Sequence, residues 1–125
     1  MKICISSTGK DLDAFVDQRF GRCQYFLIFD TETMNVKTIS NESMLSSGGA
    51  GIQAAQSVIK EDIDFVITGN IGPNAFQILQ AAGIKVYIVT EGTVKDAIEN
   101  YKNGKLKETV SANVESHSGI GGRNL

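Results

Sequence analysis

The sequence predicts an α/β protein, with a mixed sheet and helices packed on it, folded as a single domain. In the second half of the chain, short apolar segments typical of strands alternate with segments whose apolar residues recur at helical spacing. One pair of strand-like segments is joined by a short turn and another by a helix-length crossover, so both antiparallel and parallel pairs are expected. A length of 125 residues is that of one ordinary domain.

The first half of the chain predicts a strand followed by a hairpin. Residues 2–6 alternate apolar and polar side chains and lead into a polar loop. Cys4 is expected to point to the opposite side of the sheet from its two isoleucine neighbours, as a half-buried strand residue. Residues 25–30 and 35–40 are strand-like segments on either side of a short turn, which predicts an antiparallel pair.

The middle of the chain predicts a strand–helix–strand crossover. A helix over residues 52–60 begins inside or just after the glycine-rich run 46–51. The unbroken apolar segment 64–69 is typical of a strand buried on both faces, and Pro73 suits the first turn of the helix that follows it. Residues 84–89 form the next strand, so these two strands should be parallel.

The end of the chain predicts one more helix and then a tail. The helix covers residues 94–101, and Thr93 is its expected N-cap. Beyond it the periodicity fades into a segment rich in Ser, Gly and Asn, which predicts mobility. We therefore divide the chain into a domain over residues 1–107 and a flexible C-terminal tail over residues 108–125, which contains the single histidine, His117.

Composition and charge exclude several classes of function. A net charge of −2 gives no electrostatic reason to bind nucleic acid or an acidic lipid surface. No apolar run approaches the ~20 residues of a membrane helix, and a strand-like segment starts at once, so we expect a cytoplasmic protein. The two cysteines, Cys4 and Cys23, are too few for a disulfide framework or for the four thiolates that commonly hold an iron–sulfur cluster.

The segment 17–23 is the strongest candidate for chemistry. It places Arg19 and Arg22 close to Cys23, around the bend expected at Gly21. Neighbouring guanidinium groups favour the thiolate, which is the form of cysteine that ligates soft metals or acts as a nucleophile. A second interpretation stays open, in which one arginine only pairs with Asp17 and Cys23 is a small buried apolar residue.

Four segments should meet at the carboxyl ends of the parallel strands, where open α/β sheets bind ligands: residues 17–23, 46–51, 69–74 and 90–92. Their glycines would let the main chain approach a ligand and expose its N–H groups. Neither glycine run matches a known phosphate-binding fingerprint, which disfavours nucleotide binding. A cysteine–histidine hydrolase is disfavoured as well, because the lone histidine lies in the expected tail.

Several motifs in the right order resemble the dinitrogenase iron–molybdenum cofactor biosynthesis family, which includes NifX, the core of NafY and the C-terminal domain of NifB. The motifs lie at residues 19–23, 48–55, 68–75 and 82–84, and the resemblance runs from residue 1 to about residue 101. It implies a ribonuclease H-like fold with a five-stranded mixed sheet and helices on both faces. It also implies binding or carriage of an iron–sulfur-based cofactor or its precursor, and it does not imply catalysis.

The leading hypothesis is therefore a non-enzymatic carrier of an anionic iron–sulfur or iron–molybdenum-type cluster, working with a cluster donor or acceptor protein. Cys23 would supply one metal–thiolate bond, while the arginines and main-chain amides hold the cluster's own sulfides. The expected binding residues are Arg19, Phe20, Gly21, Arg22, Cys23, Gly48, Gly49, Gly51, Asn70, Gly72 and Asn74. Two alternatives are a sensor domain for a small anion, with Cys23 only packing, and a protein-interaction domain without a small ligand.

Overall fold

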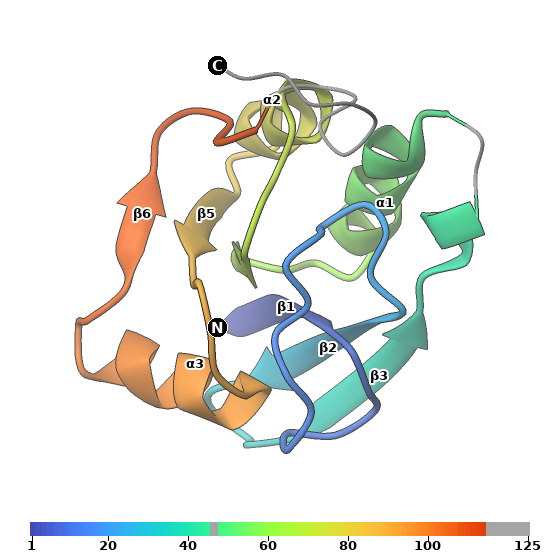
Figure 1. The fold of residues 1–125 in the computed structure, drawn as a ribbon. Helices are drawn as coiled ribbons and strands as arrows, with labels where there is room; N and C mark the ends of the chain where they lie inside the picture. The colour runs from blue at the N-terminus through green and yellow to red at the C-terminus, as the bar shows by residue number, and fades with distance from the viewer. Residues whose placement is uncertain (46–47, 115–125) are drawn as a thin grey trace.

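The computed structural model describes residues 1–45 and 48–114, and within them six strands form one mixed sheet (Figure 1). The strand order is β3-β2-β1-β4-β5-β6. Three α-helices and one short 3-10 helix connect the strands. Along the chain the elements are β1 (Lys2–Ser7), β2 (Tyr25–Asp30), β3 (Val36–Ser40), η1 (Glu42–Leu45), α1 (Ala50–Ile59), β4 (Phe65–Thr68), α2 (Pro73–Ala81), β5 (Lys85–Ile88), α3 (Val94–Lys102) and β6 (Lys107–Thr109).

The strand pairing confirms both connections that the sequence predicts. β2 and β3 form an antiparallel hairpin, and β2 also pairs antiparallel with β1. β4 and β5 are parallel and are joined through α2, and β4 also runs parallel to β1. β1, β4 and β5 therefore end at the same edge of the sheet, and the loops that leave them start side by side.

The expected number of five strands is wrong, because β6 adds a sixth. β6 pairs antiparallel with β5 through Lys107, Glu108 and Thr109. Its three side chains are polar and are exposed or only half-buried. The sequence therefore lacks the alternation of apolar residues that would predict a strand here. Ordered structure thus continues past residue 108, where the tail was expected to begin. Residues 115–125, with His117, lie outside the described residues.

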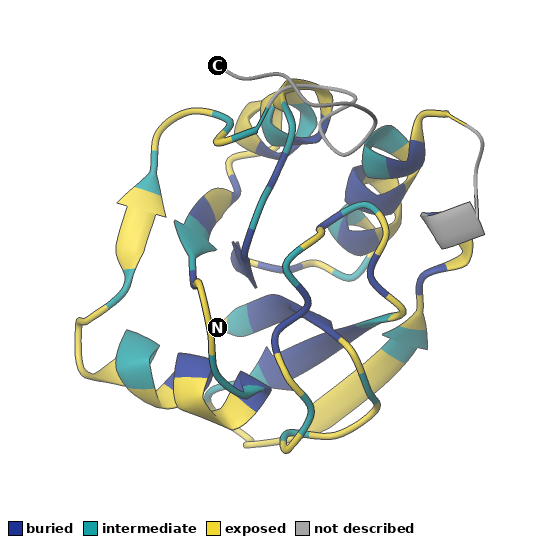
Figure 2. Cartoon of the chain, viewed as in Figure 1, coloured by how far each residue is buried: buried dark blue, intermediate teal, exposed yellow. Residues whose placement is uncertain are grey.

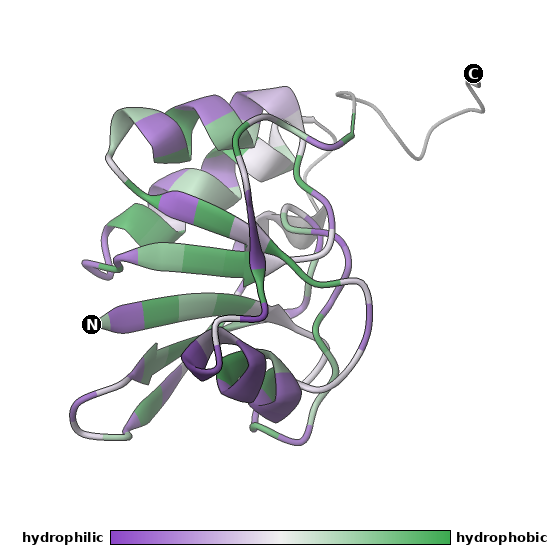
Figure 3. Ribbon diagram, turned by 90° about the vertical axis from the view of Figure 1, so that its left-hand side faces the viewer, coloured by the Kyte–Doolittle hydropathy of each residue, from purple (hydrophilic) through white to green (hydrophobic). Residues whose placement is uncertain are grey.

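The core consists of two layers, one on each face of the sheet (Figures 1 and 3). α1 and α2 cover one face and pack with Cys4, Phe26 and Val66, whereas α3 covers the other and packs with Ile3 and Ile5. Cys4 thus points away from its isoleucine neighbours, as predicted. Figure 2 shows the resulting burial of the central strands. Each large apolar side chain buried here contributes roughly 1.5–3 kcal/mol relative to an exposed one.

The ends of the helices follow from their sequences. Thr93 caps α3 in a capping box with Asp96, where each side chain accepts a hydrogen bond from the other residue's main-chain N–H. Gly83, with a φ of 78°, takes the left-handed conformation just after α2. Among the described helices, none is both long and apolar enough to cross a membrane.

Candidate functional site

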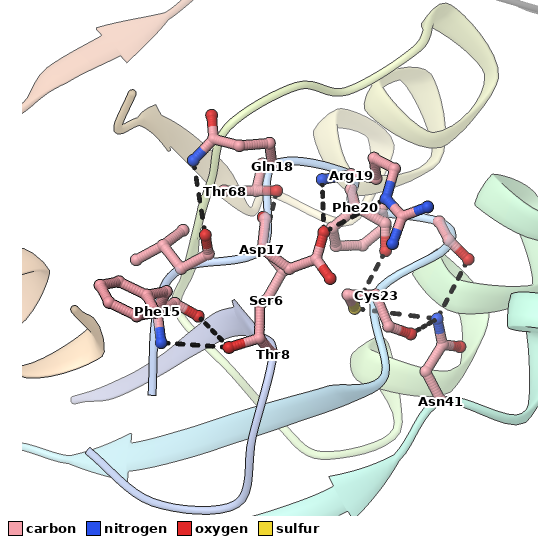
Figure 4. Close-up of polar contacts among 12 residues, drawn as sticks. Ser6, Thr8, Phe15, Asp17, Gln18, Arg19, Phe20, Cys23, Asn41 and Thr68 are labelled. Carbon is pink, nitrogen blue, oxygen red and sulfur yellow. Dashed lines mark hydrogen bonds and ion pairs between the residues drawn. The ribbon is translucent and has the colours of Figure 1, made fainter. Parts of the chain in front are cut away.

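The loop over residues 17–23 lies against two other loops at the carboxyl edge of the parallel strands. The Phe20 N–H donates to the Asn70 carbonyl oxygen at 3.2 Å, and the neighbouring Val16 N–H donates to the Gly92 carbonyl oxygen at 3.0 Å. The Asn41 side-chain amide donates to the carbonyl oxygens of Gly21 and Cys23, at 3.0 and 2.8 Å (Figure 4). The predicted segments 17–23 and 69–74 are thus directly connected, and the segment 90–92 is bonded to the residue just before the loop.

The fourth predicted segment joins this group at Gly21, which packs against the start of α1. A Cβ atom at Gly21 would lie only 2.8 Å from the Gly51 nitrogen and 2.9 Å from the Gly51 Cα. A Cβ atom at Gly51 would in turn lie 3.4 Å from the Cβ of Ala75 in α2. The loop and the first turns of α1 and α2 are therefore neighbours. Ser46 and Ser47 of the predicted run lie outside the described residues.

The N-termini of α1 and α2 share an unusual feature, because both helices follow a glycine. Gly49 precedes α1 in the left-handed conformation, and Gly72 precedes α2, so neither residue has a side chain that could cap the helix. α3, the third helix that starts at this edge, carries a full capping box. The first N–H groups of a helix need acceptors and the helix dipole favours negative charge there. The first N–H groups of α1 and α2 therefore have no N-cap side chain as a partner, and such groups are the kind that bind anions in other proteins.

Asp17 and Arg19 form an ion pair beside these helix starts (Figure 4). Asp17 Oδ1 accepts from the Arg19 main-chain N–H at 3.0 Å and from Arg19 Nε at 3.4 Å. This pairing of an arginine with Asp17 was one of the two interpretations that the sequence left open. The Asp17 side chain is only 9% exposed, whereas that of Arg19 is 67% exposed. The guanidinium group therefore still faces solvent and can meet a ligand, and Arg22 is exposed as well.

Cys23 lies in the core and not at the surface of the site. It is fully buried and packs in the same cluster as Phe20 and Phe26. Its thiol donates to the Phe20 carbonyl oxygen at 3.4 Å, and the Asn41 amide approaches the sulfur at 3.8 Å. Burial, and secondarily the negative charge of Asp17, raise the pKa of Cys23 to about 12. The expectation that the arginines favour the thiolate is therefore wrong for this structure, and coordination by Cys23 stays a prediction.

The other predicted residues differ in their access to solvent. Phe20 is buried at 2% exposure with its ring centroid 5.2 Å from that of Phe26, so its place is in the core. Within residues 1–45 and 48–114, no group of three or more His, Cys, Asp or Glu side chains could hold a metal ion. The predicted residues that reach the surface, wholly or in part, are Arg19, Gly21, Arg22, Gly48, Gly49, Gly51, Asn70, Gly72 and Asn74.

Sequence reasoning missed the buried polar residues that form hydrogen bonds with the loop over residues 17–23. Ser6 Oγ donates to the Asp17 carbonyl oxygen at 2.7 Å and contacts Thr68 Oγ1 at 2.8 Å, and both hydroxyl residues are fully buried. Asn41 is also buried and ties Gly21 to Cys23. The sequence offered one signal for these contacts, which is the polar Thr68 at the end of an otherwise apolar strand. A hydroxyl buried there needs a hydrogen-bond partner.

Fold and site together define a small single-domain α/β protein in which two helices that follow glycines and a loop with exposed arginines lie at one edge of the sheet. The family model described as "Dinitrogenase iron-molybdenum cofactor" matches residues 1–104. The chain belongs to this family, which confirms the resemblance seen in the sequence.

Known proteins agree with this assignment. The apo form of the orange protein from Desulfovibrio gigas is 41% identical with a TM-score of 0.86, over 90% of this chain and 95% of that one. A candidate NifB protein from Thermotoga is 39% identical with a TM-score of 0.78, over 90% and 97% of the two chains. An uncharacterized protein of Methanocaldococcus jannaschii is 29% identical over 71% of this chain and 78% of its own length. Family and neighbours point to iron–molybdenum cofactor biosynthesis.

Proposed function

We propose that the protein binds and carries an anionic metal–sulfur cluster, of the iron–sulfur or iron–molybdenum type, at the edge of the sheet where α1 and α2 begin. It does so without catalysing a reaction and works in the cytoplasm with a cluster donor or acceptor protein. The observation that carries this proposal is the adjacency of the arginine-bearing loop and two helix starts whose N-cap residues are glycines, which have no side chain. That the D. gigas relative was solved in an apo form supports a bound group in this family.

The donors available for such a cluster are main-chain N–H groups and guanidinium groups. In α1 they belong to the first turn, from Ala50 onward, and in α2 to Asn74 and Ala75, because Pro73 has no N–H. Hydrogen bonds from such groups to a charged acceptor contribute about 1.5–3 kcal/mol each. The sulfides of a preassembled cluster can accept these bonds, so the protein needs no thiolate of its own.

Cys23 has a different part in this proposal from the one that the sequence predicted. A thiol with a pKa near 12 stays protonated at neutral pH, and its sulfur is enclosed by the core. We therefore place the cluster against the amides and arginines, and Cys23 beneath them as a packing residue. Direct coordination would first require the loop to open and the thiol to lose its proton.

Anaerobic titration with tetrathiomolybdate, the simplest molybdenum–sulfur dianion, tests the proposal, and a synthetic four-iron cluster serves as the iron–sulfur probe. Absorption spectroscopy follows binding by the wild type, by Cys23→Ser and by Arg19→Ala/Arg22→Ala. We expect Cys23→Ser to retain the probe and the double variant to bind it much more weakly. Failure of the wild type to bind either sulfur-containing probe would refute the proposal.

The burial of Cys23 also favours a second candidate, a sensor domain for a small anion that contains no metal–sulfur bond. Both candidates use the same amides and arginines, so the identity of the ligand atoms separates them. Molybdate has the shape and charge of tetrathiomolybdate but carries oxygen in place of sulfur. Equal affinity for the two dianions, or tighter binding of molybdate, would favour the sensor, whereas preference for tetrathiomolybdate would favour the cluster carrier.

A further inference from the structure

The segment that follows β6 returns to the candidate site and binds the loop between β4 and α2 through one side chain, Asn113. Its Oδ1 accepts from the Ile71 N–H at 2.7 Å, and its Nδ2 donates to the Gly69 carbonyl oxygen at 2.9 Å. The Asn113 N–H also donates to the Ile71 carbonyl oxygen at 3.1 Å. A single residue thus engages both main-chain groups of Ile71 and a third main-chain group two residues before it.

Ile71 is a position where such partners are needed. It is 1% exposed and its side chain belongs to the core beneath α1 and α2. Main-chain groups at a buried position cost about 1–3 kcal/mol when left without a hydrogen bond. Strand pairing in β4 ends at Thr68 and α2 begins at Pro73, so neither element satisfies them. Asn113 supplies the missing donor and acceptor.

The same loop is held on its other side by the arginine-bearing loop. The Phe20 N–H donates to the Asn70 carbonyl oxygen, and a Cβ atom at Gly69 would lie 2.7 Å from the Gln18 Cα. Residues 69–71, which lead into α2, therefore contact the loop over residues 17–23 on one side and Asn113 on the other. What holds Ile71 also fixes Gly72, the residue that precedes α2.

We propose that Asn113 is a positioning residue of the anion site, which holds the loop from Gly69 to Ile71 so that the first amides of α2 converge on the same ligand as those of α1. The inference rests on the proposed function. Asn113 lies beyond residues 1–104, the part that the family model matches. The contacts of Asn113 thus link the segment after β6 to ligand affinity.

The test compares Asn113→Ala with Asn103→Ala, the same substitution just after α3 on the opposite face of the sheet. Tetrathiomolybdate is titrated anaerobically into the full chain, well below the unfolding temperature. We expect Asn113→Ala to bind it roughly tenfold more weakly, as for residues that orient ligand-holding groups elsewhere. At saturation its charge-transfer band should lie closer to that of the free probe, while Asn103→Ala matches the wild type.

If Asn113 only stabilised the fold, its replacement would not change the spectrum of the bound probe at saturation. The spectrum therefore distinguishes a positioning role from a purely structural one. Wild-type affinity and spectrum in Asn113→Ala, together with faster hydrogen exchange at the Ile71 amide, would overturn the inference and leave the proposed function intact. No binding by the wild type would refute the proposed function itself, and the inference with it.

Asn113→Asp serves if the alanine variant does not fold, because it keeps the acceptor for Ile71 and loses the donor to Gly69. Its added charge is screened at high salt, so weaker binding that persists there supports the positioning role. Binding that returns to the wild-type value at high salt contradicts it.

Discussion

Replacing Gly21 by alanine should disrupt the contact that brings the arginine-bearing loop onto α1. The new Cβ would lie 2.8 Å from the Gly51 nitrogen, 2.9 Å from the Gly51 Cα and 3.2 Å from the Ala50 carbonyl carbon. All three atoms are main-chain atoms at the start of a helix, so no side chain can rotate away to make room. Overpacking of this kind costs about 1–3 kcal/mol, which corresponds to a fall in unfolding temperature of roughly 4–12 °C.

Gly48→Ala is the matched control, since among the described residues a Cβ atom at Gly48 has nothing within 4 Å. Both substitutions reduce the entropy of the unfolded chain by the same amount, so the difference between them isolates the steric term. Thermal and urea unfolding of both variants and the wild type measure it. A Gly21→Ala variant as stable as Gly48→Ala would show that the loop and α1 are not in tight contact, which would contradict the geometry of the site.

Three further predictions concern Cys23, Asp17 and the cap of α3. Because the pKa of Cys23 rises from 9.0 to about 12 on folding, its protonated thiol stabilises the fold fully below pH 9, and about 4 kcal/mol should be lost between pH 9 and 12. Urea unfolding across this range should therefore show a steeper loss in the wild type than in Cys23→Ser, and equal slopes would contradict the raised pKa. Asp17→Asn removes the negative charge beside Arg19 and Cys23, so tetrathiomolybdate titration should show several-fold tighter binding; unchanged or weaker binding would place the anion elsewhere. Asp96→Ala removes the N3 half of the α3 capping box and should lower the free energy of unfolding by about 0.3–1.5 kcal/mol, without changing probe affinity, since α3 packs on the other face of the sheet.

The sequence was informative about elements with a strong local pattern. The apolar strands, the hairpin and the crossover through α2 follow from periodicity and from Pro73, and the structure has all of them. β6 lacks such a pattern because its three residues pair only at the edge of the sheet. Assignment of the sheet to ribonuclease H-like folds stays a prediction.

The prediction for Cys23 was wrong about the thiolate because neighbours in sequence do not share a direction in space. Arg19 and Arg22 are exposed, whereas Cys23, next to Arg22 in the chain, is buried in the core with Phe20. Proximity along the chain therefore indicated a positive environment that the sulfur does not have. The role of Asn113 was equally hidden, since its partners lie 42 and 44 residues away and no local motif connects them.

Under the proposed function, a buried Cys23 changes how the protein would hold and release its cargo. A metal–thiolate bond would have to be exchanged for another ligand before the cargo could leave. Main-chain amides and exposed arginines instead release an anion when a competing surface offers similar donors, and no covalent bond is broken. Asp17 also favours release, because its carboxylate lies beside Arg19 and repels an anionic cargo. In the proposed site, donors positioned by Asn41, Gly21 and Asn113 are thus combined with a limited positive charge, and that combination would favour reversible loading over permanent storage.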